Sequence, residues 1–505
     1  MTVNERAAQD TRPSAEVARD SSFAERAAQT SERLATWCLI GLLAWVQFPF
    51  GSNRPWAWSL LSLLAAVVWL AWLPAGLLRL DETTRALRRV AGPAIALLAV
   101  LIWAFLQASP ITPQSWHHAI WSVLADGTAR ATAGTVSMNP FETVTEAMKL
   151  STYVAIGWLS YWHARSHSQA RRIFVAVVVV GTAYAIYGMF LSAIGSGQTM
   201  VLDDLVPPYQ RDVTGGFISK NSFATFDGIA LAACVLLLGD VARDTVVATR
   251  GIRQLAVTLI QLLLGRAVFL VIAAVILFVA LALSDSRGGL LSTLGGLLVI
   301  FTFGIVSAAR RGTMRWAATA FAATLAAMIV LFSISGDSLQ TRFDQLVETR
   351  GQEDLRPVFW DAAIHAIEGY PYLGSGLGTF RDSYNLYADR FEPYIIDRAH
   401  NDYLELALGL GIPMALLCVG ALGWITLICV RGVMTRRRRR LYALGAVSAT
   451  TIVALHSFVD FSLQMPAVAV LYAVVLGVGL GQAQGRSERG DRMLARGAQR
   501  HEAGK

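Results

Sequence analysis

Long apolar runs alternate with short polar segments along most of this chain of 505 residues. The hydrocarbon core of a bilayer is about 30 Å thick, and a helix needs roughly 20 apolar residues to cross it. The pattern therefore predicts an all-α, polytopic membrane protein with twelve transmembrane helices, because helices satisfy their own backbone hydrogen bonds in lipid. The spans are expected near residues 34–50, 56–78, 90–108, 147–163, 173–194, 221–239, 267–284, 288–308, 316–334, 403–430, 441–459 and 463–481.

The composition supports this class. Hydrophobic residues make up 54% of the chain and charged residues 15%, whereas soluble domains carry about 25% charged residues. These values exclude an ordinary soluble enzyme and a disordered chain. The cysteines fall inside apolar runs without the spacing of a metal or redox site, so we expect them to act as small core residues. They are Cys38, Cys234, Cys418 and Cys429.

The positions of the basic residues predict the orientation. With the N-terminus inside, the inner segments and both tails hold roughly 31 of the 43 Lys and Arg residues, as the positive-inside rule requires. The run from Arg436 to Arg440 then reads as a topology anchor near anionic lipid, with nucleic-acid binding as a remote alternative. Residues 1–33 and 482–505 are polar and are expected to be disordered cytoplasmic ends. No apolar stretch precedes Leu34, so the first span is expected to be an uncleaved anchor.

The candidate chemistry lies in the outer segments, of which residues 335–402 form the longest. This loop contains Arg342, Arg350, Arg356, Arg381, Arg390 and Arg398. A long loop largely escapes the positive-inside rule, so the arginines need another explanation. Either they pair with the carboxylates of the same loop, or they bind an anion, because a guanidinium group suits phosphate oxygens.

Within this loop the segment LRPVFWDAAIHAIEGYP predicts a helix that starts near Pro357 and ends near Gly369. We expect it on the outer membrane surface, with Trp360 near the headgroups. Its apolar face is predicted to comprise Trp360, Ala363, Ile364 and Ile367. The GSGLG that follows lacks the Lys-Ser/Thr ending of a phosphate loop, so a tight turn is the favoured interpretation.

Further polar residues lie where outer segments meet predicted spans. His400 and Asn401 precede the tenth span, where an imidazole can accept a proton near neutral pH, although a capping or interfacial histidine is the alternative. Arg287 lies between two spans, at a depth where an arginine needs a partner such as Asp285, a polar cavity, or a route to the interface. Lys220 and Asn221 begin the sixth span. The segment HSFVDF ends the eleventh.

Four ordered segments resemble the O-antigen ligase / O-antigen polymerase superfamily of Wzy-type membrane glycosyltransferases. They are SRGGLL, Arg356-x3-Trp360 followed by PYLGSGLGTF, His400-Asn401-x9-Gly411, and SKNSFATF. The resemblance covers residues 211–415, and HSFVDF-x4-PA extends it to 467. Met414 departs from the ligase pattern, which leaves the choice between ligase and polymerase open.

The resemblance implies a GT-C-like, metal-independent enzyme without a cofactor, multi-pass in the bacterial inner membrane, with its active site facing the periplasm. Such enzymes take a glycan from undecaprenyl diphosphate. A ligase transfers it to the lipid A-core sugar, and a polymerase to another lipid-linked repeat, in lipopolysaccharide or exopolysaccharide biosynthesis. The expected partners are therefore lipid-linked glycan, acceptor glycan and membrane lipid, without nucleic acid. The implied division is helices 1–9 in 34–334, a large periplasmic loop with catalytic elements in 335–402, and helices 10–12 in 403–481.

The resemblance also implies roles for single residues. Arg287 and Arg356 would stabilise the diphosphate, and His400 would deprotonate the acceptor hydroxyl. The implied substrate-binding residues are Asn401, which would also orient His400, together with Lys220, Asn221, Arg211, Arg342 and Trp360. The alternative function is a transporter or flippase for a lipid-linked oligosaccharide or an anion, which predicts charged groups along a cavity from face to face.

Overall fold

The computed structural model describes residues 15–128, 133–194, 212–246, 257, 265, 267–309, 355–389, 395–435 and 440–484. All regular secondary structure in these residues is helical. The α-helices are α2 (Ala15–Trp45), α3 (Pro55–Leu78), α4 (Leu80–Arg89), α5 (Ala91–Gln107), α6 (Ile120–Thr128), α7 (Pro140–His163), α8 (His167–Ala193), α9 (Lys220–Val246), α11 (Val268–Leu283), α12 (Arg287–Ala309), α15 (Arg356–Gly369), α16 (Phe380–Tyr387), α17 (Asp402–Leu410), α18 (Ile412–Thr435), α19 (Arg440–His456) and α20 (Pro466–Gln484). Short 3-10 turns lie at η1 (Phe50–Ser52), η2 (Gln114–Trp116) and η4 (Ser462–Gln464).

Six of the described helices are long and apolar enough to cross a membrane: α3, α8, α9, α12, α18 and α20. Helices α4 and α5, which meet at a bend of 82°, would form a seventh span if counted together, and α11 is apolar but shorter. The polytopic helical class is thus confirmed. Twelve spans remain a prediction, since α2, α7 and α19 do not meet this criterion and the predicted span at 316–334 lies outside the described residues.

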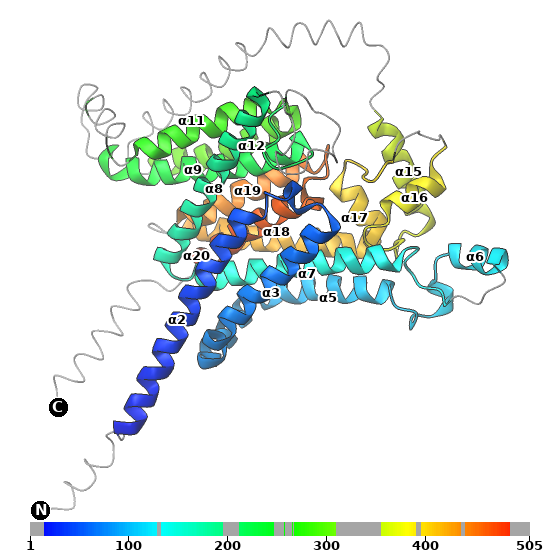
Figure 1. Ribbon diagram of the computed structural model, residues 1–505, viewed down its shortest axis with the longest axis horizontal. Helices are drawn as coiled ribbons and strands as arrows, with labels where there is room; N and C mark the ends of the chain where they lie inside the picture. Colours follow the sequence, from blue (N-terminus) through cyan, green and yellow to red (C-terminus); the bar gives the residue numbers. More distant parts are fainter. Residues whose placement is uncertain are drawn as a thin grey trace, which may run out of the picture.

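Helix α20 lies in the middle of the bundle and is buried along almost its whole length. It packs against α7 on one side and α19 on the other, and α9, α11 and α12 lie beyond α19 (Figure 1). The contact between α20 and α7 is close because both helices carry glycine there: a Cβ on Gly477 would lie 2.4 Å from the carbonyl oxygen of Gly157. Small residues let helix backbones approach in lipid, where packing holds helices together.

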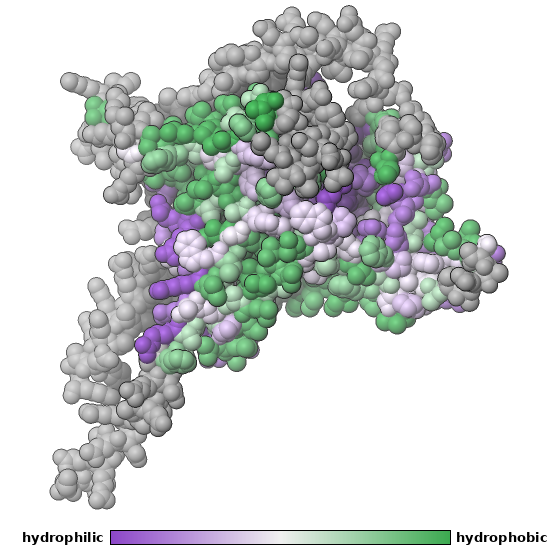
Figure 2. Space-filling model, viewed as in Figure 1, coloured by the Kyte–Doolittle hydropathy of each residue, from purple (hydrophilic) through white to green (hydrophobic). Residues whose placement is uncertain are grey.

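Apolar and polar side chains separate along the bundle. Apolar residues cover the lengths of α3, α5 and α11, and hydrophilic residues gather around α15 to α17 at one end and near the far ends of α2 and α8 at the other (Figure 2). An apolar belt between two polar ends is the distribution that a bilayer requires.

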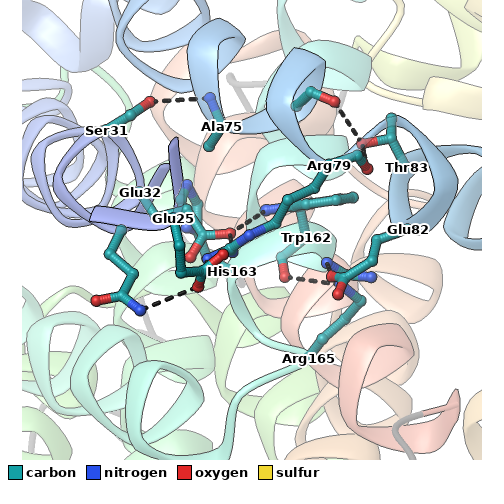
Figure 3. A network of polar contacts seen from close by, with 12 residues as sticks. Glu25, Ser31, Glu32, Ala75, Arg79, Glu82, Thr83, Trp162, His163 and Arg165 are labelled. Carbon is teal, nitrogen blue, oxygen red and sulfur yellow. Dashed lines mark hydrogen bonds and ion pairs between the residues drawn. The ribbon is translucent and has the colours of Figure 1, made fainter. Parts of the chain in front are cut away.

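A polar network joins α2, α3, α4 and α7 at the end opposite to α15–α17 (Figure 3). Arg79 forms ion pairs of 2.6 Å with Glu25 and 2.8 Å with Glu32. The indole of Trp162 donates to Glu32 at 3.1 Å, and the Arg165 guanidinium lies over the Trp162 ring. The sequence analysis predicted disorder for residues 1–33. Helix α2 starts at Ala15, however, so residues 15–33 are helical. Residues 1–14 and 485–505 lie outside the described part.

The predicted tenth span is divided at Gly411, which separates α17 from α18 and has a φ of 79°. The apolar span therefore begins at Ile412 and not at residue 403. Gly374 explains the break, because a Cβ there would lie 2.4 Å from the carbonyl oxygen of Gly409. The loop at Gly374 presses against the end of α17, and the chain turns there because glycine tolerates a positive φ.

Helix α15 forms where it was predicted, but it buries a different face. Its buried residues are Phe359, Ala362, Ala363 and Ala366. Ile364, expected on the apolar face, is 45% exposed. The helix packs on α16 and α17, and its alanines permit that close contact, so the neighbouring helices set its rotation.

Candidate active site

The predicted site residues that the structure describes lie on four segments, which meet the turn 456–464 between α19 and α20 at the α15–α17 end of the bundle. The four are the start of α9, the start of α12, the start of α15, and the extended segment 395–401. Each segment adjoins the end of a helix, where the backbone leaves regular hydrogen bonding and polar side chains can converge.

His400 is held by a carboxylate that sequence reasoning did not identify. Its Nδ1 lies 3.0 Å from Oδ1 of Asp460, a residue that is fully buried, while the His400 side chain is 32% exposed. The imidazole also packs edge-on against Phe461, at 4.6 Å between ring centroids. His400 has a φ of 54°, an uncommon conformation that recurs where a functional side chain must point in a set direction.

His456 connects the turn that carries Asp460 to α9 and α12. Its Nδ1 forms a short hydrogen bond with Thr225 of α9 and lies 3.2 Å from Oγ of Ser462. A Cβ built on Gly288 would lie 2.9 Å from the Nε2 of His456, so the first turn of α12 packs directly on this ring. The sequence places Arg287 next to Gly288, and the charge of Arg356 also acts on His456. His456 thus brings both predicted arginines near the turn that holds His400.

The two arginines differ from the sequence-based expectation in their surroundings. Arg287 is exposed at the first residue of α12 and forms no ion pair or side-chain hydrogen bond with the described residues. This excludes pairing with Asp285, one of the alternatives that the sequence left open. Arg356 is half-buried at the first residue of α15, where Pro357 suits the first turn.

Lys220 and Asn221 hold the turn that precedes Arg287. Lys220 Nζ lies 2.9 Å from Asp212 and 3.4 Å from Asp285, so two carboxylates already compensate its charge. Ser286 Oγ donates to Oδ1 of Asn221 at 2.8 Å. Both predicted substrate-binding residues are thus engaged in fixing α9 to the turn before α12.

Trp360 and Asn401 are also committed to the protein's own backbone. Trp360 Nε1 donates to the carbonyl of Ala399 at 3.0 Å, which ties α15 to the residue before His400. Asn401 caps α17 by accepting from two backbone N–H groups, and its amide donates to the carbonyl of Phe458. The ring of His400 is therefore oriented by Asp460 and not by Asn401.

Arg398 of the long loop pairs with carboxylates, which is one of the two explanations that the sequence offered for the loop arginines. The Arg398 side chain is 12% exposed and lies 3.6 Å from Glu146 of α7 and 3.4 Å from Glu405 of α17. Burial opposes its charge, but Glu405 and Glu146 together raise the pKa of Arg398 above its ordinary value. Arg398 thus ties the loop to α7. Arg211, Arg342, Arg350 and Arg390 lie outside the described residues.

The GSGLG segment forms a turn, as predicted, and not a phosphate loop. The backbone N–H groups of Ser375 and Gly376 donate to the carbonyls of Leu408 and Gly409 at 2.9 and 3.0 Å. Its three glycines have positive φ values. A phosphate loop needs free N–H groups, and these are taken by the end of α17.

A second loop supports the far end of α15. The backbone N–H of Ala119 donates to the hydroxyl of Tyr370 at 3.0 Å, and the Tyr370 ring stacks on His118 at 4.2 Å. Burial lowers the pKa of His118 to about 4, so this imidazole is neutral near pH 7. The contacts fix α15, and with it Arg356, relative to α5 and α7.

Asp402, two residues after His400, is buried with only part of its bonding capacity used. Its Oδ2 accepts from Ser457 Oγ at 2.7 Å and from the N–H of Leu463 at 3.3 Å, and its Oδ1 has no partner among the described residues. Burial raises the pKa of Asp402 to about 8, while the hydrogen bond from Ser457 acts in the opposite direction.

The raised pKa predicts a pH-dependent stability. The folded protein prefers protonated Asp402, whose ordinary pKa is 3.8, so its contribution is complete below that pH and is lost as the pH rises towards 8. Asp402→Asn keeps the hydrogen bonds without the charge. We expect its Tm at pH 9 to exceed that of the unmodified protein by at least about 2 °C, and the difference to shrink steadily as the pH falls towards the ordinary pKa of Asp402. Parallel Tm curves in a thermal unfolding series from pH 5 to 9 would contradict this.

The described residues contain no group of three or more His, Cys, Asp and Glu side chains placed to hold a metal ion.

The sequence analysis placed the segment HSFVDF at the end of the eleventh span but did not identify its Asp460 as the partner of His400. The two residues are 60 positions apart in the sequence, so local spacing does not indicate the hydrogen bond between them.

Comparison with known proteins gives one family match. A family model described as O-antigen ligase matches residues 272–419, a range that contains Arg287, Arg356 and His400. No curated protein matched the chain. The match over residues 272–419 supports membership of the O-antigen ligase superfamily.

Proposed function

We propose that this protein is a membrane glycosyltransferase that moves a glycan from undecaprenyl diphosphate to an acceptor sugar hydroxyl. The reaction would occur on the periplasmic face of the bacterial inner membrane, in lipopolysaccharide or exopolysaccharide biosynthesis. The observation that carries the proposal is the turn 456–460, where Asp460 holds His400 and His456 packs against the start of α12 beside Arg287.

The arginines suit the leaving group. As the acceptor oxygen attacks the anomeric carbon, the bond from that carbon to the diphosphate oxygen breaks, and its electron pair remains on the diphosphate. Fixed cations stabilise such developing charge most where water is excluded. Arg287 and Arg356 would supply them, and the configuration at the anomeric carbon would invert because attack and departure occur on opposite sides. The proposed step uses no metal or cofactor, since a diphosphate is already a good leaving group.

His400 suits the acceptor. Its Nδ1–H donates to the Asp460 carboxylate, which leaves the lone pair of Nε2 to accept the proton of the attacking hydroxyl. The partial exposure of the ring allows a sugar to reach it. General-base catalysis of this kind contributes about 10²–10⁴ in rate.

Asp460 is a positioning residue in this scheme, and Asp460→Asn tests that role. An amide placed at Nδ1 favours the wrong imidazole tautomer, so we expect kcat to fall by about 10²-fold or more, with little change in the KM for the lipid-linked donor. The acidic limb of the pH–rate profile is expected to move as well, which a purely structural residue would not cause. Normal kcat in a folded Asp460→Asn protein would contradict the assignment.

The alternative, a transporter or flippase, requires polar groups along a path between the two faces. The predicted site residues that the structure describes instead lie at one end of the bundle, and this favours transfer over transport.

Deletion of the gene tests the proposed function. We expect either loss of capped lipopolysaccharide with accumulation of lipid-linked polymer, the result for a ligase, or products limited to a single repeat, the result for a polymerase. A glycan gel identical to that of the parent strain would overturn the proposal.

A further inference from the structure

An apolar cavity of about 250 Å³ lies between α5, α7, α18 and α20, with α17 at one end. Its lining on α7 follows one helix face, from Glu146 through Leu150, Val154 and Trp158 to Tyr161. The 15 residue steps from Glu146 to Tyr161 correspond to a length of about 22 Å, most of the thickness of a bilayer's hydrocarbon core. The cavity is therefore long and narrow.

The walls suit a hydrocarbon chain. Charged and amide side chains in the lining occur only at the α17 end, where Glu146, Asp402 and Gln464 lie. Protein interiors are normally close-packed, and an apolar void of this length forfeits dispersion contacts along its whole surface. A hydrocarbon chain from the membrane restores those dispersion contacts along the apolar part of the lining.

The polar end of the cavity adjoins the candidate active site. Asp402 is two residues from His400, and its Oδ1 is buried without a partner among the described residues. Gln464 also lines this end of the cavity. It lies three residues after Phe461, which packs on the His400 ring. A molecule whose chain occupies the cavity therefore has its head close to His400.

The position of the cavity argues against the donor as its occupant. Lys220 and Arg287 belong to α9 and α12, on the other side of α19 and α20 from α5 and α7 (Figure 1). At the cavity end the basic groups are already paired: Lys149 lies 2.8 Å from Glu146, and Arg398 lies between Glu146 and Glu405. A departing diphosphate is better stabilised at Arg287 and Arg356.

The size of the cavity selects the kind of acceptor. Its volume of about 250 Å³ lies below the range of about 300–1,000 Å³ that is typical of sites for compact ligands. It has room for a segment of one chain. A glycolipid with several acyl chains could place only one of them there, whereas a polyprenyl carrier has a single chain.

We infer that the cavity holds the single chain of a polyprenyl-linked acceptor, which presents its sugar hydroxyl to His400 from the side opposite to the donor diphosphate. The inference rests on the proposed function. It favours the polymerase reaction over the ligase reaction, because the polymerase has a polyprenyl-linked acceptor.

The test is photolabelling of the full chain in vesicles of phosphatidylethanolamine and phosphatidylglycerol, with a diazirine-bearing polyprenyl phosphate as the probe. We expect labelled peptides from α7, α18 and α20. Val154→Trp, which fills the cavity, should reduce this labelling at least tenfold. The matched control Val179→Trp changes a residue of α8 that is 60% exposed, and should leave the labelling unchanged. If Val154→Trp does not fold, Leu422→Trp fills the cavity from α18 and takes its place.

Further arms separate the possible occupants. Arg287→Ala should leave the cavity labelling intact; its loss would mean that the donor chain occupies the cavity and would overturn the inference. Equal labelling by a diazirine phospholipid would assign the cavity to bulk lipid and also overturn it. Labelling does not require turnover, so the two proposals can fail separately. If the protein transfers glycan but its cavity is not labelled, this inference alone is contradicted. If the cavity is labelled but the protein transfers no glycan, the proposed function is contradicted.

Discussion

Replacement of His400 by alanine is expected to slow glycan transfer by about 10²–10⁴-fold, the contribution of a general base. The imidazole would be the only proton acceptor that the proposed step uses, and Asp460 fixes its Nδ1 so that Nε2 faces the acceptor. The loss should fall mainly on kcat, because His400 acts on a proton that moves in the transition state. Rates are to be measured with purified protein in vesicles that contain a polyprenyl diphosphate-linked glycan.

His365→Ala is the matched control for this variant. His365 lies on α15, its side chain is 49% exposed, and it contacts Asp361 of the same helix rather than the candidate site. We expect its rate to stay within about twofold of the unmodified protein, since isolated surface substitutions have small effects. Equal rates for His400→Ala and His365→Ala, in two folded proteins, would remove His400 from the reaction.

Replacement of Arg287 by alanine is expected to reduce kcat by about 10²–10³-fold, the usual consequence of removing one fixed group that stabilises transition-state charge. Arg287→Lys keeps the charge but loses the planar guanidinium group that binds two phosphate oxygens. Its rate should therefore lie between that of Arg287→Ala and that of the unmodified protein. Arg356→Ala should resemble Arg287→Ala. The measurement is single-turnover release of polyprenyl diphosphate, which separates the chemical step from product release.

Arg381→Ala serves as the control for loop charge. Arg381 is exposed in the first turn of α16 and is not among the predicted site residues. It should retain the rate of the unmodified protein at physiological salt, where exposed charges are screened. A loss of activity in Arg381→Ala equal to that in Arg287→Ala would indicate that general positive charge, and not a placed guanidinium, drives the reaction.

Hydropathy was sufficient to identify the helical membrane class, because a span needs only a sufficient length of apolar residues. It was not sufficient to place the start of the tenth span. That start depends on the loop at Gly374, which presses against the carbonyl of Gly409 and makes the chain turn at Gly411. Composition within a span carries no information about a contact with a distant loop.

The ordered motifs were sufficient to identify which segments would meet, but not what each side chain does there. Arg356 and Arg398 are equivalent in a sequence, and only the fold shows that Arg398 is paired with Glu146, 252 residues earlier. Likewise, only the fold shows that the Trp360 indole donates to the carbonyl of Ala399. Such assignments depend on long-range contacts, for which local spacing offers no signal.

The sequence offers only an indirect indication of the apolar cavity. Its lining on α7 repeats at steps of three and four residues, which is the pattern of any buried helix face. Periodicity alone cannot distinguish a face packed against protein from one that lines a cavity.

The most direct measurement follows both products of a single reaction. Purified protein is incubated in vesicles with a polyprenyl diphosphate-linked glycan and an acceptor, and released polyprenyl diphosphate and extended acceptor are counted together. The account predicts equal amounts of the two from the unmodified protein and neither above background from a His400→Ala, Arg287→Ala double variant. Release of diphosphate without extension of the acceptor, or extension that persists in the double variant, would contradict it.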